Sequence, residues 1–326
     1  MSLHVHLNRV SKKEDIETLK TLLSKDILLT VGEDPQREAN YDVLVHDAPS
    51  VEWIENHPNL RAIIIPWAGV NKETIQLLRQ YPRISLHNLH HNNFNTAELG
   101  FALLLAASKN LVPMDQALRK NDWSTRFSMR KAILLREKTA LILGFGEIGR
   151  ALASYCLGLG MQVKAIRKHI EVETDDLSVD VYSADRLHQL LPKADVIFIA
   201  LPLTEETKDL IGEKELMLLP KDSILINIGR GPVVNQFALY NALKSGHLAA
   251  AGSDVWYNYP SSRAAHFDTP PADVPFGELE NFVLSPHRGG MVEDVEMQWA
   301  HALADLLNAA NQNLPIPNRV DLEAGY

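Results

Sequence analysis

Short apolar runs alternate with segments of helical periodicity along most of the chain. In the first hundred residues the apolar runs are 5–7, 27–31, 43–45 and 62–65, and the helical segments are 12–24, 51–56 and 72–80. A second series begins at residue 139, with apolar runs at 139–143, 163–166, 196–200, 224–228 and 250–253. Runs of this length between helical segments are typical of parallel strands covered by helices. The pattern therefore predicts an α/β protein with two such units.

Two longer helical segments predict how the chain passes between these two units. Asn95-Thr96-Ala97-Glu98 resembles a capped helix start, and the pattern that follows continues to about Asn110. We expect this helix to lead from the first unit to the second. The last helical pattern covers residues 292–309 and precedes a proline-containing tail, which predicts that the chain returns to pack on the first unit.

A glycine triad lies where the first apolar run of the second series meets a helical pattern. Gly144, Gly146 and Gly149 follow the order G-x-G-x-x-G. In such a strand-turn-helix unit the first glycine allows a tight turn, the second lets a pyrophosphate approach the backbone amides, and the third lets the helix lie against the strand. The positive end of the helix dipole then faces the phosphates. The triad therefore predicts a dinucleotide-binding unit.

Length and composition narrow the possible functions. A chain of 326 residues suffices for about two domains, and its net charge of −9 leaves no basic excess for a nucleic acid partner. The one cysteine, Cys156, is interpreted as a small buried residue. The longest apolar cluster, 99–107, is too short to span a bilayer, and the N-terminus has no signal-peptide pattern. We expect a cytoplasmic protein that makes no membrane contact.

The cofactor preference depends on the residues after the second strand of the dinucleotide-binding unit. Eighteen residues beyond Gly149, where an acid would accept hydrogen bonds from the ribose hydroxyls, the chain has Arg167 and then Lys168. Two cations suit the 2′-phosphate of NADP(H). NADP(H) is therefore the favoured cofactor, and NAD(H) stays possible if the pair is only a solvated basic turn.

Four further motifs follow the glycine triad in order. They are Ala200-Leu201-Pro202-Leu203-Thr204-Glu205-Glu206-Thr207, Asn227-Ile228-Gly229-Arg230-Gly231-Pro232-Val233-Val234, Gly252-Ser253-Asp254-Val255 and Ser285-Pro286-His287-Arg288-Gly289-Gly290. With the triad, they resemble the D-isomer-specific 2-hydroxyacid dehydrogenase family over about residues 69–318. The resemblance implies a Rossmann-like dinucleotide-binding domain, 112–287, inserted into a flavodoxin-like substrate domain, 1–111 and 288–326. It also implies an active site between the domains and a homodimer.

The resemblance further implies which residues contact the substrate and the cofactor. Ala68 and Gly69 correspond to a loop whose backbone amides bind the substrate carboxylate. The implied cofactor contacts come from the glycine turn and from the loops after the later strands: Gly144, Gly146, Glu147, Ile148, Gly149, Arg167, Lys168, Pro202, Thr207, Ile228, Gly229, Asp254 and Gly289. No metal site is expected, because His87, His90 and His91 have no cysteine or carboxylate at ligand spacing.

Arg230 and His287 suit the reduction of a 2-keto acid. This reaction needs a cation for the carboxylate, a hydride donor, and a proton donor for the carbonyl oxygen. The planar guanidinium of Arg230 can hold the carboxylate through two hydrogen bonds and polarise the carbonyl. His287 can donate the proton as imidazolium and accept it as imidazole in the reverse direction. The resemblance implies catalytic roles for both residues.

The third catalytic position departs from the family pattern. Five residues after Asp254, where family members have a glutamate that pairs with the histidine, this chain has Tyr259. A phenol with a pKa of roughly 10 has no negative charge at neutral pH. Either Tyr259 only orients the imidazole, or Glu278 or Glu280 supplies the charge from the segment that follows.

These features predict an NAD(P)-dependent D-2-hydroxyacid dehydrogenase, or 2-keto acid reductase, that acts on a small substrate such as glyoxylate or hydroxypyruvate. One alternative is a formate dehydrogenase-like oxidoreductase. The resemblance to NAD-dependent formate dehydrogenases includes the Asp-Val-Trp tripeptide, an asparagine at Asn92 and a non-acid at position 259. The other alternative is a weakly active NAD(H)-sensing scaffold of the corepressor type. Arg230 and His287 together favour the enzyme, since neither side chain is needed merely to bind a nucleotide.

Overall fold

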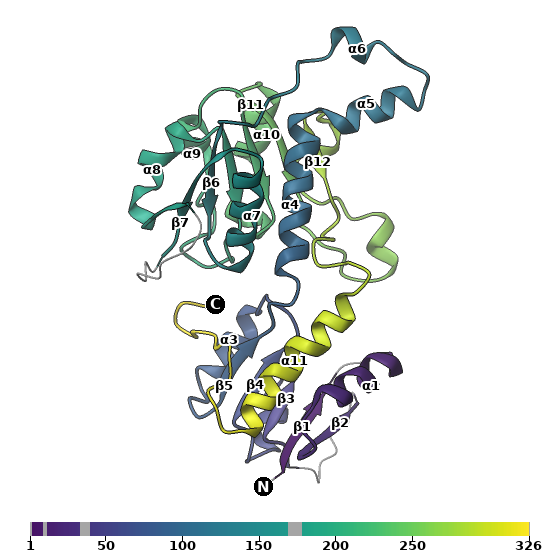
Figure 1. Ribbon diagram of the computed structural model, residues 1–326, viewed down its shortest axis with the longest axis vertical. Helices are drawn as coiled ribbons and strands as arrows, with labels where there is room; N and C mark the ends of the chain where they lie inside the picture. Colours follow the sequence, from purple (N-terminus) through teal and green to yellow (C-terminus); the bar gives the residue numbers. More distant parts are fainter. Residues whose placement is uncertain (1, 9–11, 33–39, 169–177, 326) are drawn as a thin grey trace. The chain divides into compact units, whose positions relative to one another are not determined.

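The computed structural model describes residues 2–8, 12–32, 40–168 and 178–325. The chain forms two compact units (Figure 1): unit 1 is Met1–Asn92 with Met291–Tyr326, and unit 2 is Asn93–Gly290. These boundaries differ from the predicted ones at 111/112 and 287/288. The first boundary lies at 92/93 instead of 111/112, because helix α4 (Asn93–Ser108) packs on strands and a helix of unit 2. Within the described ranges, no helix is long and apolar enough to cross a membrane.

Unit 1 is built on a parallel sheet whose described strands have the order β2-β1-β3-β4-β5. The strands are β1 (Leu3–Leu7), β2 (Ile27–Val31), β3 (Val43–Val45), β4 (Ala62–Ile65) and β5 (Ser85–Asn88). The order 2-1-3-4-5 is that of flavodoxin-like sheets. The flavodoxin-like fold predicted for the substrate domain is therefore confirmed.

Helices cover both faces of this sheet: α1 (Lys13–Leu22), α2 (Val51–Glu55), α3 (Lys72–Leu78) and α11 (Val295–Asn311). Along β3, Val43 and Val45 point into the core beneath α1 and α11, while Leu44 points into the core beneath α2 and α3. Buried side chains of α11, such as Leu303, complete the first core. The predicted return of the C-terminal helix to the first unit is confirmed.

Unit 2 is built on a second parallel sheet, with the order β12-β11-β10-β9-β6-β7-β8 among its described strands. The strands are β6 (Thr139–Leu143), β7 (Gln162–Ile166), β8 (Asp180–Tyr182), β9 (Val196–Ile199), β10 (Ser223–Asn227), β11 (Leu248–Ser253) and β12 (Phe282–Leu284). From β8 to β11 this is the Rossmann order 3-2-1-4-5-6, and β12 is added at the edge. The order reverses between β6 and β9, so a ligand crevice is expected at the carboxyl ends of these two strands.

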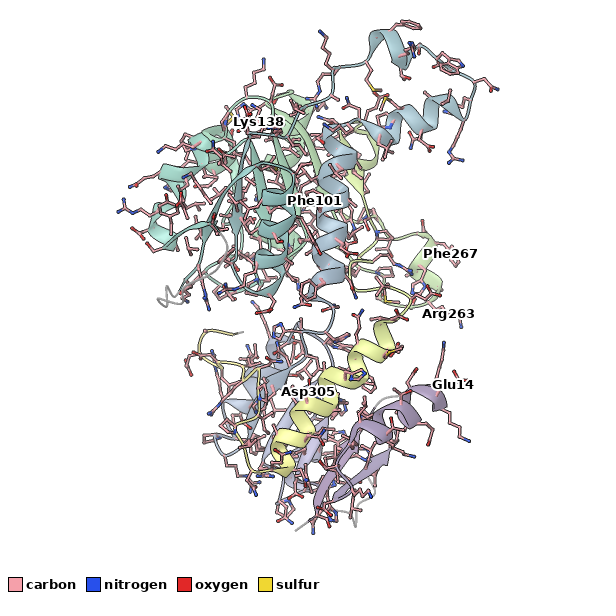
Figure 2. The ribbon with its side chains drawn as sticks, viewed as in Figure 1. Glu14, Phe101, Lys138, Arg263, Phe267 and Asp305 are labelled. Carbon is pink, nitrogen blue, oxygen red and sulfur yellow. The ribbon has the colours of Figure 1, made fainter. Side chains whose placement is uncertain are left out.

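Helices again cover both faces of the sheet in unit 2. On one face α4 lies beside α7 (Glu147–Gly158), and Phe101 of α4 contacts Tyr155 of α7 with 5.7 Å between ring centroids (Figures 1 and 2). The other face carries α8 (Leu187–Leu190), α9 (Glu213–Leu218) and α10 (Gln236–Lys244). Helices α5 (Leu111–Leu118) and α6 (Thr125–Ser128) extend away from the sheet (Figure 1). Short 3-10 helices occur at Ala184–Arg186, Leu191–Lys193, Gly231–Val233, Ala264–Phe267 and Phe276–Glu278.

Candidate active site

The glycine triad forms the turn between β6 and α7, at the carboxyl edge of the sheet. Gly144 has a φ of 100°, and a Cβ there would lie 2.5 Å from the carbonyl oxygen of Ala200. A Cβ at Gly149 would overlap the carbonyl oxygen of Gly144. At Gly146, by contrast, a Cβ would meet no described atom within 4 Å. The turn itself thus requires the first and third glycines, and the second faces open space that a pyrophosphate would fill.

Helix α7 begins at this turn. Its N-cap is Gly146, which has no side chain to accept hydrogen bonds from the amides of the first turn. These amides and the helix dipole suit a bound phosphate. Glu147 and Ile148 follow directly; the carboxylate of Glu147 lies 3.5 Å from the amide nitrogen of the Asn93 side chain, and Ile148 packs against the core beneath α4. The arrangement fits the pyrophosphate of a dinucleotide.

Two loops flank the glycine turn. Arg167 and Lys168 follow β7 on one side, and residues 200–207 follow β9 on the other. In the second loop the hydroxyl of Thr207 donates to the carbonyl oxygen of Pro202 at 2.7 Å. Lys168 Nζ forms an ion pair with Glu206 at 2.7 Å. The two expected cations are therefore beside the turn, but Lys168 already faces a carboxylate.

Arg230 follows the end of β10. The side-chain amide of Asn227 accepts a hydrogen bond from Gly229 N and donates one to the carbonyl oxygen of Arg230, which fixes this loop at Ile228 and Gly229. The guanidinium donates to the carbonyl oxygen of Gly229 at 2.7 Å. Burial lowers the pKa of Arg230 from its usual value, and the neighbouring Tyr259 opposes this shift. Asn227 lies in the same sequence motif as Arg230, but its positioning role could not be predicted from that motif.

His287 lies in a loop that Asp254 holds in place. The buried carboxylate of Asp254, just after β11, accepts hydrogen bonds from Ser285 Oγ at 2.5 Å and from the backbone amides of Arg288 and Gly289 at 2.7 Å. His287 itself has a φ of 57°, a left-handed conformation that is uncommon for residues other than glycine. Hydrogen bonds on both sides of His287 thus stabilise a backbone conformation that the residue alone would seldom adopt.

Tyr259 lies beside His287, with 5.5 Å between ring centroids and 52° between ring planes. Its hydroxyl oxygen accepts a hydrogen bond from Trp256 N at 3.0 Å. Burial raises the pKa of Tyr259 above 10, so this side chain is a neutral phenol at neutral pH. Burial also lowers the pKa of His287 from 6.5; the charge of Asp254 opposes the shift and that of Arg230 adds to it. The four side chains are therefore close enough to influence one another electrostatically.

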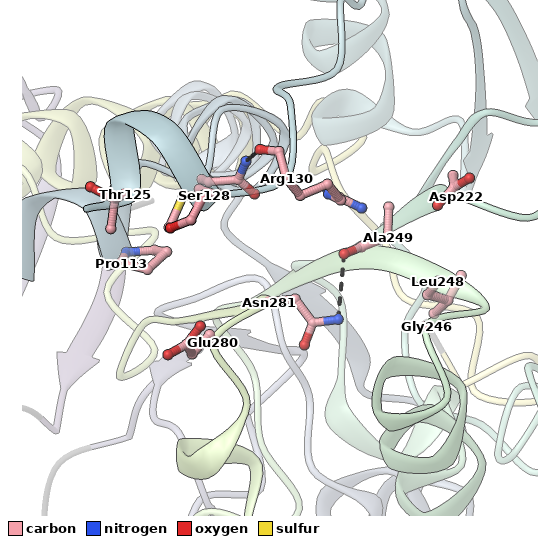
Figure 3. A pocket seen from close by; sticks show the side chains of 12 residues that line it. Pro113, Thr125, Ser128, Arg130, Asp222, Gly246, Leu248, Ala249, Glu280 and Asn281 are labelled. Carbon is pink, nitrogen blue, oxygen red and sulfur yellow. Dashed lines mark hydrogen bonds between the residues drawn. The ribbon is translucent and has the colours of Figure 1, made fainter. Parts of the chain in front are cut away.

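Glu278 and Glu280 do not lie on this edge of the sheet. Both precede β12, whereas His287 follows it, and β12 runs parallel to β11. Glu280 instead lines a hollow of about 480 Å³ at the amino edge, together with Arg130, Asp222 and Asn281 (Figure 3). The hypothesis that either glutamate supplies the missing charge is therefore wrong. The segment after Tyr259 instead leads to Phe267, whose side chain is 94% exposed (Figure 2).

The other predicted site residues lie in unit 1. Ala68 and Gly69 follow β4, and the side-chain amide of Asn88 donates to the carbonyl oxygen of Ala68 at 2.7 Å. His87 is held by Pro317 and Ser85 through its two ring nitrogens, which is a structural role. Among the described residues, no group of three or more histidine, cysteine, aspartate or glutamate side chains could hold a metal ion.

Comparison with known proteins identifies the family. A family model for the "D-isomer specific 2-hydroxyacid dehydrogenase, NAD binding domain" matches residues 101–289. The chain belongs to this family. Unit 2 is its NAD(P)-binding domain, and the family resemblance expected from the motifs is confirmed.

Three relatives illustrate the similarity. The chain is 33% identical to a glyoxylate reductase of Thermococcus litoralis over 284 residues, which are 85% of this chain and 82% of that enzyme. It is 35% identical to a glyoxylate reductase of Korarchaeum cryptofilum over 233 residues, and 31% identical to a D-3-phosphoglycerate dehydrogenase of Archaeoglobus fulgidus over 316 residues. The chain spans only 66% and 56% of the lengths of these last two relatives.

A solved structure agrees with the fold. The D-isomer specific 2-hydroxyacid dehydrogenase from Xanthobacter autotrophicus Py2, crystallised with NADPH and MES, has a TM-score of 0.79 and covers 100% of this chain and 99% of its own. The two sequences are 22% identical, so this likeness shows the fold alone.

The crowding at Gly149 yields a first prediction. Gly149→Ala should displace the glycine turn, because the added methyl group would overlap the Gly144 carbonyl, and should weaken NADH and NADPH binding by at least about tenfold. Gly158→Ala in the same helix is the matched control, since a Cβ there meets no described atom within 4 Å. Titration of nucleotide fluorescence gives both dissociation constants. Equal affinities in the two variants would contradict the proposed contact of the turn with the cofactor.

Proposed function

We propose that the protein is an NAD(P)-dependent 2-keto acid reductase, which in reverse oxidises a D-2-hydroxy acid. The observation that supports this activity is the grouping of Arg230, His287 and Tyr259 on the same sheet edge as the glycine turn. A nucleotide-sensing scaffold has no need of such a group, because neither the guanidinium nor the imidazole is required to bind the cofactor.

In this mechanism each side chain has a separate task. The guanidinium of Arg230 binds the substrate carboxylate and polarises the adjacent carbonyl. The bound cofactor supplies the hydride. Protonated His287 donates its proton to the carbonyl oxygen, while Tyr259 packs against the imidazole and the fixed carboxylate of Asp254 stabilises its charged form. Neutral imidazole accepts the proton when the hydroxy acid is oxidised.

The substrate is proposed to be a small 2-keto acid such as glyoxylate or hydroxypyruvate. Two of the relatives above bear the name glyoxylate reductase, and the backbone amides near Ala68 and Gly69 are proposed to bind the substrate carboxylate together with Arg230. A panel of 2-keto acids, with NADH or NADPH consumption followed at 340 nm, tests the activity. We expect turnover with at least one of these two substrates, and no turnover with any 2-keto acid would contradict the proposal.

The cofactor preference and the oligomeric state are each proposed from one feature of the structure. NADP(H) is favoured over NAD(H) because two cations, Arg167 and Lys168, follow β7 where an acid would bind the ribose.

A homodimer is proposed because the segment with α5 and α6 carries strongly exposed apolar side chains, among them Trp123, Phe127 and Leu134. The cytoplasmic location stays a prediction.

Arg230→Lys tests the carboxylate clamp. Lysine keeps the positive charge but lacks the planar pair of donors, so we expect kcat/KM for the keto acid to fall by about a hundredfold or more. Cofactor affinity should change less than about twofold, because the clamp acts on the substrate. Near-parental turnover in the lysine variant would show that Arg230 does not hold the carboxylate.

The protonation state of His287 determines the expected pH dependence of reduction. The reaction needs protonated His287, whose pKa lies below 6.5, so kcat/KM should fall as pH rises through that lowered pKa. Tyr259→Glu would place a carboxylate beside the imidazole and should move the falling limb of the profile up by about one pH unit or more. Tyr259→Phe, which adds no charge, is the control and should leave the limb in place. An identical limb in the glutamate variant would show that position 259 does not tune the histidine.

A further inference from the structure

We infer that Glu206 is a cofactor-specificity residue, whose carboxylate competes with the 2′-phosphate of NADP(H) for Lys168 and offers an acceptor to the ribose hydroxyls of NAD(H). The inference rests on the proposed dinucleotide-dependent activity and concerns the adenosine end of the same site. It predicts that the site also binds NAD(H), so that the preference for NADP(H) is smaller than Arg167 and Lys168 alone would produce.

The Lys168–Glu206 ion pair joins the two loops that flank the glycine turn. β6 lies between β7 and β9, Lys168 follows β7 and Glu206 follows β9. Gly144 N donates to the carbonyl oxygen of Ile166 at 3.0 Å, and Ala200 N donates to that of Leu143 at 2.8 Å, so both loops leave the sheet from fixed points. In Rossmann folds the adenosine ribose lies at this part of the edge, next to the end of the second strand. The ion pair therefore lies at the ribose position.

Local hydrogen bonds fix the position of Glu206. The side-chain oxygens of Thr204 and Thr207 accept hydrogen bonds from each other's backbone amides, at 3.2 and 2.8 Å, and Thr207 Oγ1 also donates to the carbonyl oxygen of Pro202. Glu206 lies between these two threonines. Its carboxylate is therefore presented by an ordered turn, from which it reaches Lys168 at 2.7 Å.

The charges at this position should give NADP(H) and NAD(H) different binding affinities. A 2′-phosphate would have to displace the carboxylate of Glu206 from Lys168 and would be repelled by it. A ribose hydroxyl carries no charge and can donate a hydrogen bond to the same carboxylate, which is the task of the acid that usually follows the second strand. Glu206, in the neighbouring loop, would thus take the role of the acid that usually follows the second strand, where this chain has Arg167 and Lys168.

Binding measurements on charge-neutral variants test this assignment without reference to turnover. Dissociation constants for NADPH and NADH are measured by nucleotide fluorescence in the full-length parent, in Glu206→Gln and in Glu205→Gln. The last variant is the matched control, because it removes the same charge from the adjacent residue. We expect Glu206→Gln to tighten NADPH binding by about three- to tenfold at low salt and not to tighten NADH binding. Glu205→Gln should change the NADPH to NADH ratio less than about twofold.

A Lys168→Met background shows whether the effect passes through the ion pair. There, adding Glu206→Gln should change the NADPH to NADH ratio less than in the parent, since the cation shared by carboxylate and phosphate is gone and only the direct repulsion between the two anions remains. An unchanged ratio in Glu206→Gln, or an equal shift in Glu205→Gln, would overturn the inference while leaving the proposed function intact. A parent protein that binds neither nucleotide would contradict the proposed function itself.

Discussion

The buried carboxylate of Asp254 is the constraint on which the geometry of His287, the proposed proton donor, depends. A buried carboxylate is costly unless donors surround it, and here Ser285, Arg288 and Gly289 supply three hydrogen bonds. Those bonds hold the loop after β12 against the end of β11 and keep His287 in its left-handed conformation. Loss of this carboxylate would therefore release His287 from its position as well as remove a negative charge.

Asp254 also contributes a negative charge in the proposed mechanism, in which Tyr259 stands in place of a glutamate. Its negative charge raises the pKa of His287, whereas burial and Arg230 lower it, and the lowering effects prevail. Tyr259 contributes ring packing and accepts the amide of Trp256, but it supplies no charge at neutral pH. The imidazolium is thus supported by a carboxylate that is already engaged in holding the loop. We expect this support to be weaker than that of a glutamate paired directly with the histidine.

The buried strands were predictable because their sequences are apolar on both faces. The predicted bounds of β6, 139–143, agree with the structure, whereas β5, β8 and β12 were not predicted. All three missed strands are the last named strands of their sheets, where polar residues such as Asp180 are tolerated; beyond β5 there is only a bridge from His87 to Arg319. The omission of β12 had a direct consequence: without that strand, the sequence could not reveal that Glu280 and His287 lie at opposite edges of the sheet. The boundary between the units was also misplaced, because α4 has apolar residues all around and its sequence does not indicate which sheet it covers.

The proposed hydride transfer is tested by following deuterium in a single reduction of hydroxypyruvate. The protein is incubated with nicotinamide cofactor deuterated at the transferable position of C4, and the glycerate formed is analysed by mass spectrometry and chiral chromatography. We expect D-glycerate with one deuterium at C2, since in the proposed reaction the hydride comes from the cofactor and the proton from the protein. Glycerate without deuterium, or the L-isomer, would contradict it.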